Sequence, residues 1–223
     1  MVERRSVWLP SLALGLLAAA ALSARADLHA LNLSLSRSDM KRALALARWP
    51  HTDTERVRFH DQYLTVVDTH LSPLSMTPAV IQVEVVTEFR RLELIAEEHE
   101  RAGDWFGRAG LDEVEAALKP WRGLVAIDVH FQLPGGCGPL ADVACSPVIP
   151  PTDVSIGGIG TVRAGQALRS FWYARSGSSP LPLGNAAEAK FDAAVIGQTT
   201  REVRVVVDGR ELARVAIDFG ALE

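Results

Sequence analysis

Residues 77–103 constrain the fold most, because they form the longest stretch with a single hydrophobic period. Apolar or neutral residues recur there at steps of three and four, which places them on one face of a helix. These positions are Ile81, Val85, Phe89, Leu92, Ala96 and His99. The spacing predicts a continuous helix over residues 77–103, against which the flanking segments pack.

Both ends of this stretch carry signals that mark helix ends. Thr77 can act as an N-cap, Pro78 suits the first helical position, and Gly103 can end a helix in the left-handed region. One alternative stays open, because residues 80–86 are rich in β-branched side chains and alternate in polarity. The first part of the stretch could therefore form a strand, although the end signals favour the helix.

A continuous helix has consequences for its polar and aromatic neighbours. Five glutamates on or beside it are expected to form a solvated face: Glu84, Glu88, Glu93, Glu97 and Glu98. Three aromatic residues after it are expected in the core, with an aromatic platform for a ligand as the alternative: Trp105, Phe106 and Trp121.

The N-terminus has the pattern of an export signal. Arg4 and Arg5 precede an apolar segment at residues 8–22, and residues 24–26 read Ala-Arg-Ala, a small-x-small cleavage site. Residues 1–26 are therefore expected to be removed, so that the mature chain begins at Asp27 in the periplasm or outside the cell. The alternatives are an uncleaved anchor and, for the route, twin-arginine instead of general export.

Cleavage leaves 197 of the 223 residues, enough for one ordinary domain. The removed segment holds three arginines and one glutamate, so the formal charge changes from −4 to −6. An acidic chain without a basic patch is a poor ligand for nucleic acid and for anionic lipid. No second apolar stretch is long enough to span a membrane after signal cleavage.

Residues 27–122 are expected to form a mostly helical region. A helix at residues 39–48 has Ser38 as its cap, and a short helix follows at residues 53–60. A strand is expected at residues 63–69. The last helix of this region places Leu111, Val114, Leu118 and Trp121 on one face.

Residues 123–223 are expected to form an antiparallel β region. Residues 124–133 alternate as a strand with one buried and one largely solvated face. Further strands are predicted at residues 166–175 and 187–193, whereas residues 154–162 are too rich in glycine for a good central strand.

Asp208-Gly209 marks a C-terminal hairpin. A three-residue loop at residues 207–209, with Gly209 in the left-handed position of a bulge, is favoured over a two-residue loop. The reason is that it gathers the apolar side chains of both strands on one face. These are Val203, Val205, Ala213, Val215, Ile217 and Phe219.

These elements predict an α+β fold. A helical N-terminal half packs with a C-terminal antiparallel β-sandwich, either immunoglobulin-like or part of such a sandwich.

Motifs that name a reaction are missing from the sequence: it has no G-x-S-x-G, no phosphate-binding loop and no H-E-x-x-H. Two D-x-H pairs stand out, Asp68 with His70 and Asp128 with His130. Each pair falls on a predicted strand, where residues i and i+2 share a face. If the strands were neighbours, the four side chains could bind Zn²⁺. The alternative is a solvated pair on the polar face of an edge strand.

Two functional hypotheses follow. The favoured one is a non-catalytic accessory or binding module that is exported, needs no cofactor, and binds another envelope protein or a small ligand. The alternative is a metal-dependent hydrolase that uses the D-x-H pairs.

Cys137 and Cys145 bracket a Gly/Pro-rich loop, and in an exported protein the default prediction for such a pair is a disulfide. Two reduced thiols or a metal site are the alternatives. Because the loop is short, its closure predicts a stabilisation of about 2–3 kcal/mol. Intact mass before and after alkylation, without reductant, is expected to show no alkylated thiol. Two free thiols in exported material would contradict the prediction.

Overall fold

The computed structural model describes residues 34–48, 60–67, 79–108, 110–132, 149–171 and 181–222. Several predictions fall outside these residues and are not tested by it. They concern the signal peptide and its cleavage site, Thr77 and Pro78, the helix at residues 53–60, Asp68 and His70, and the disulfide between Cys137 and Cys145.

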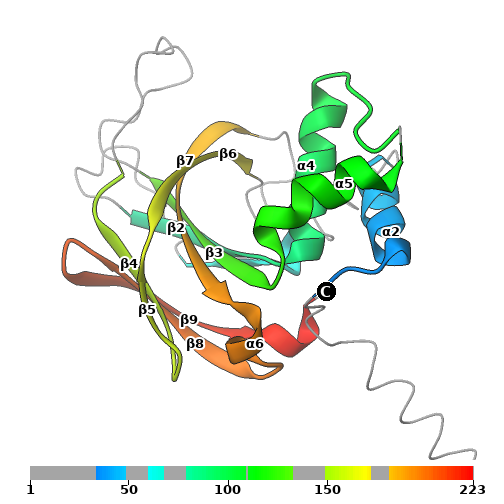
Figure 1. Cartoon of the computed structure of the whole chain (residues 1–223). Coiled ribbons are helices and arrows are strands. Elements are labelled where there is room, and N and C mark those ends of the chain that lie inside the picture. Colours follow the sequence, from blue (N-terminus) through cyan, green and yellow to red (C-terminus); the bar gives the residue numbers. More distant parts are fainter. Residues whose placement is uncertain are drawn as a thin grey trace, which may run out of the picture.

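The described part of the chain folds into two antiparallel sheets and a group of helices, so the α+β class is confirmed (Figure 1). The five-stranded sheet has the order β1 (Leu64–Val66), β2 (Ala79–Val86), β3 (Leu124–Gln132), β7 (Leu181–Asp192) and β6 (Gly165–Phe171). The four-stranded sheet has the order β5 (Gly160–Arg163), β4 (Thr152–Ile156), β8 (Thr200–Val207) and β9 (Arg210–Asp218).

Three helices gather on one side of the molecule: α2 (Arg37–Arg48), α4 (Glu88–Arg101) and α5 (Leu111–Leu118) (Figure 1). Shorter elements are η2 (Lys119–Trp121), α6 (Ala193–Ile196) and η3 (Phe219–Ala221). None of the helices in the described ranges is long and apolar enough to cross a bilayer.

The apolar side chains form two main clusters. One cluster takes side chains from both sheets, including Val125, Ile127 and Val129 of β3 and Val203 and Val205 of β8. The other lies among α2, α4 and α5. A small third cluster joins the helices to the five-stranded sheet through Val86, Leu94, Trp121 and Ala126. The five-stranded sheet is therefore covered on both faces.

The prediction of one continuous helix over residues 77–103 is wrong, and its alternative is confirmed. Residues 79–86 form β2, and α4 begins at Glu88. Thr87 between them is extended, with φ −75° and ψ 172°, and its side chain accepts a hydrogen bond from the Arg90 N–H at 3.1 Å. The β-branched run thus adopts the strand conformation it prefers, and Thr87 is a second N-cap signal inside the stretch. Gly103, at φ 72°, ends the helix as predicted.

Helix α2 lies close to its prediction but has a different cap. The Ser36 N–H donates to Asp39 Oδ2 at 3.1 Å, and the Asp39 N–H donates to Ser36 Oγ at 3.2 Å. This reciprocal pair starts the helix at Arg37, so Ser38 is not the cap. The predicted apolar face is confirmed, since Met40, Ala43, Leu44 and Ala47 are all buried.

Residues 154–162 contradict their prediction. They contribute to β4 and β5, and β4 lies between β5 and β8 inside the four-stranded sheet. The glycines do not weaken β4, because Gly157 and Gly158 occupy the turn after it. Gly158 has φ 79°, a conformation that glycine adopts readily.

The C-terminal hairpin has the predicted buried face but not the predicted loop. Val207 pairs with Arg210, so only Asp208 (φ 48°) and Gly209 (φ 77°) form the turn. A register shift follows at Val205/Val206, where Ala213 rather than Leu212 pairs with Val205. This bulge brings the apolar residues of β8 and β9 onto one face, as a three-residue loop would also have done. Of the six predicted residues, five are buried and Val215 packs half-buried against the same core.

Replacing Gly209 tests this turn. Gly209→Val is expected to destabilise the protein by about 1–2 kcal/mol, because a β-branched residue is strained at positive φ. Nothing lies within 4 Å of a Cβ built at Gly209, so the loss would come from the backbone alone. Gly209→Asn is the matched control and should lose less, since Asn tolerates the left-handed region. Equal urea midpoints for Gly209→Val and the wild type would contradict the assigned turn.

Candidate functional site

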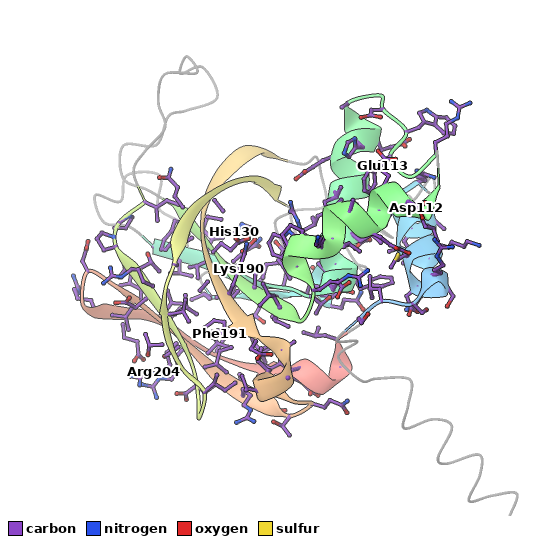
Figure 2. The ribbon with its side chains drawn as sticks, in the orientation of Figure 1. Asp112, Glu113, His130, Lys190, Phe191 and Arg204 are labelled. Atoms are coloured by element: carbon purple, nitrogen blue, oxygen red, sulfur yellow. The ribbon has the colours of Figure 1, made fainter. Side chains whose placement is uncertain are left out.

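The helix-facing side of the five-stranded sheet carries a row of acidic side chains. Glu84 on β2 is opposite Asp128 on β3, and Asp128 is opposite Glu188 on β7. Since neighbouring strands lie about 4.8 Å apart, these residues are direct cross-strand neighbours. Two residues further along β3, on the same face, His130 is opposite Gln82 on β2. Figure 2 shows His130 and Lys190 on this part of the sheet.

Helix α4 brings Arg90 onto this row. Its guanidinium Nε and Nη2 donate to Glu84 Oε1 at 3.0 and 2.8 Å, and its Nη1 donates to Glu93 Oε2 at 3.1 Å. The Thr87 cap explains why Arg90 lies here, because it starts α4 directly after β2. Arg90 and Glu93 are three residues apart, so they lie on the same side of the helix. The guanidinium also lies over the Tyr63 ring, 5.3 Å from its centroid.

Two histidine–glutamate pairs flank Arg90. His130 Nε2 lies 3.2 Å from Glu84 Oε2, and His60 Nε2 lies 3.3 Å from Glu97 Oε1. We call the six residues Glu84, Arg90, Glu93, Glu97, His60 and His130 the buried charge network. Their exposed fractions are low: 0% for His130, 1% for His60, Arg90 and Glu93, and 3% for Glu84. These five residues are therefore sealed from solvent, whereas the Glu97 side chain, at 13% exposed, is half-buried.

Sealing the network changes its proton affinities. Burial raises the pKa of Glu84, but the charge of Arg90 and the hydrogen bonds from His130 and Arg90 outweigh this and hold it well below its ordinary value. Burial raises the pKa of Glu93 to about 8, because Arg90 is shared with Glu84 and offsets only part of the desolvation. Burial and the charge of Arg90 lower the pKa of His60. At neutral pH, Arg90 and Glu84 are thus charged, whereas Glu93 and His60 are neutral.

The structure places only half of the predicted metal ligands. Asp128 and His130 share a face of β3, as predicted, but both are fully buried, so the expected solvated face of this strand is wrong. The prediction failed because β3 is a central strand covered by helices rather than an edge strand. Among the described residues, no three His, Cys, Asp or Glu side chains are grouped so as to hold a metal ion. The Zn²⁺ hypothesis, which also needs His70, stays a prediction.

The expected solvated acidic face is also wrong. Glu84, Glu88 and Glu93 are buried and Glu97 is half-buried, while Glu98 alone is exposed. Arg90 and Tyr63 were missed as residues of the site. Two signals could have found it: Gln82 and Glu84 alternate within a β-branched run, and Thr87 precedes Arg90 as a cap.

The aromatic prediction is confirmed for two of its three residues. Phe106 and Trp121 are buried, and two cations lie over the Trp121 ring, Arg91 at 4.7 Å and Lys190 at 4.1 Å from its centroid. Trp105, in contrast, is 63% exposed, so its assignment to the core is wrong.

Comparisons with known proteins gave no guide to this site, since no family model, no curated protein and no solved structure matches the chain.

Removing the guanidinium of Arg90 is expected to lower the free energy of unfolding and the urea midpoint. Arg90→Met should destabilise the protein by about 3–5 kcal/mol, because it leaves the Glu84 carboxylate buried without its cation. The double variant Arg90→Met/Glu84→Gln should recover part of that loss, since it removes the stranded charge as well. Urea unfolding followed by fluorescence measures both free energies.

Arg91→Met is the matched control for Arg90→Met. It removes an arginine from the next position of α4, where the guanidinium lies over Trp121. Its expected cost is only about 0.5–1 kcal/mol. If the Arg90 and Arg91 variants were equally stable, the buried charge network would not hold α4 on the sheet.

The raised pKa of Glu93 predicts a pH dependence of stability. A carboxyl group whose folded pKa exceeds its unfolded value favours folding fully below the unfolded pKa, and this contribution is lost as the pH rises through the folded pKa of about 8. Wild-type stability should therefore fall between pH 7 and 8, by about 1.4 kcal/mol per pH unit at most. Glu93→Gln should remove this decline, whereas Glu98→Gln, at an exposed position, should keep it. Identical pH profiles for the two variants would contradict the assignment.

Proposed function

We propose that the protein is a non-catalytic accessory or binding module that acts in the periplasm or outside the cell. The observation that carries this proposal is that the ionisable side chains of the buried charge network contact one another, and that five of the six are sealed from solvent. A substrate could not reach Glu93 or His130 without separating α4 from the sheet. The buried charge network is, on this proposal, a structural device.

The export signal at residues 1–26 and the pair Cys137 and Cys145 support the proposed location. The shared apolar cluster of the two sheets supports the finer prediction of a β-sandwich, immunoglobulin-like or part of one. On this proposal, partners bind at surface loops, as is common for modules built on a rigid scaffold.

A metal-dependent hydrolase is the second candidate. Two observations favour it: Asp128 and His130 lie on one face of β3, and the pKa of Glu93 is shifted far from its ordinary value. Shifted pKa values gather at catalytic sites, but structural ion pairs shift them too. We assign the buried charge network to the structural ion pairs, since Arg90 neutralises Glu84 within it.

Metal content and hydrolysis separate the two candidates. We expect the purified full chain to carry no stoichiometric zinc and to hydrolyse none of a panel of chromogenic esters, phosphates and glycosides, with or without added Zn²⁺. Elemental analysis and absorbance measure these outcomes. Stoichiometric zinc or a hydrolysis rate that His130→Asn abolishes, and that the surface variant Val195→Ala keeps, would overturn the proposal in favour of the hydrolase.

A further inference from the structure

The segment between α4 and α5 presents a tryptophan to solvent. Trp105 is 63% exposed, and the one other exposed large apolar side chain among the described residues is Val195, at 54%. A single exposed apolar residue needs no explanation in general. An exposed indole is different, because it leaves a large apolar area in water that a partner can cover.

The backbone that carries Trp105 is firmly seated. On one side of it, His99 Nδ1 lies 2.6 Å from Asp104 Oδ2, and the His99 ring stacks on buried Phe106 with centroids 4.7 Å apart. On the other side, the Gly107 N–H donates to Glu113 Oε2 at 3.0 Å. Gly107 fits so closely that an added Cβ would lie 3.0 Å from Val114 and 3.1 Å from Leu44. Trp105 is thus held outward by a packed segment, which lowers the entropy lost on binding.

A cation accompanies the indole. The Arg108 guanidinium lies 5.3 Å from the centre of the Trp105 ring. Tryptophan and arginine are the residues that most often dominate the energy of protein–protein interfaces. Trp121 shows that an indole in this chain can take two cations, since Arg91 and Lys190 both lie over it. Trp105 has one such cation in Arg108 and a large exposed area beside it.

The charge around Trp105 is acidic. Residues 98–119 hold six acidic and three basic residues. Two of the carboxylates are widely exposed, with side-chain values of 59% for Asp104 and 95% for Asp112, although Asp104 also meets His99 and Asp112 also pairs with Arg37 of α2 at 3.0 Å. Figure 2 shows Asp112 and Glu113 at the start of α5, next to this segment. Such a rim repels anionic lipid and attracts a basic partner.

We propose that Trp105, with Arg108, Asp104 and Asp112, forms a docking surface for a basic segment of another protein. A lysine or arginine of the partner would stack on the open part of the indole, and Asp104 and Asp112 would pair with its neighbouring cations. This inference rests on the proposed binding function and names its surface and the chemistry of its partner.

The test uses the purified full chain and a fluorescein-labelled peptide of alternating arginine and glycine, with binding followed by anisotropy. We expect binding that Trp105→Ala weakens at least about tenfold. Trp105→Phe should retain more of the binding than Trp105→Ala, and Asp104→Asn/Asp112→Asn should weaken it. Val195→Ala removes the other exposed apolar side chain without changing charge, and should leave binding unchanged. Equal urea midpoints show that each variant is folded.

Three outcomes would overturn this surface: no binding of the peptide, equal binding by Trp105→Ala and Val195→Ala, or binding to phosphatidylglycerol vesicles in place of the peptide. The last outcome would assign Trp105 to a membrane. None of them bears on zinc or hydrolysis, so the non-catalytic proposal would stand. Conversely, zinc-dependent hydrolysis would remove the non-catalytic proposal whatever Trp105 binds.

Discussion

The ion pair of Arg90 with Glu84 is the interaction on which the arrangement of the two layers depends. It joins α4 to β2 across a single intervening residue, Thr87, and so fixes the direction in which the chain turns back over the sheet. Replacing a buried ion pair by apolar residues is often neutral or stabilising, so such a pair is weak evidence for net stability. Its stronger effect is on geometry, because the placement of α4 on the sheet decides whether the Glu84 carboxylate meets the Arg90 guanidinium. Other placements of the helix would leave a buried charge without a partner.

This arrangement makes the five-stranded sheet unlike an ordinary two-layer sheet. One face of this sheet contributes to the apolar cluster that it shares with the four-stranded sheet, through Val83, Val85 and the apolar side of β3. Its other face is also buried, but it carries Glu84, Asp128 and His130. Polar residues can stay there because α4 supplies a cation and a second carboxyl group, and because Glu93 is protonated at neutral pH. Arg90 thus faces one ionised carboxylate, Glu84, and one protonated carboxyl group, Glu93, instead of two carboxylates.

This dual burial also explains which parts of the fold could be predicted from the sequence. Helices α2 and α5 and the buried face of β9 follow from the period that one buried side and one solvated side impose. The same logic fails for residues 77–103, because a strand and a helix that follow each other there both contribute apolar residues to a pattern with steps of three and four. The prediction fails again at Asp128 and His130. Polar and apolar residues alternate along a strand in the same way whether its polar face is solvated or is buried against other polar side chains. The hairpin loop failed for a subtler reason: a bulge at Leu212 and a longer loop bring the same residues onto one face.

The candidate site was the hardest part to predict, since its members come from the segment before β1, from β2 and β3, and from α4. His60 and His130 are 70 positions apart in the sequence. Each meets a glutamate that had been assigned to a solvated helix face. Their chemistry therefore follows from the fold rather than from local spacing. With these ionisable groups turned inward and in contact with one another, the proposed binding function falls to the outer surface, where a packed segment holds Trp105 in water.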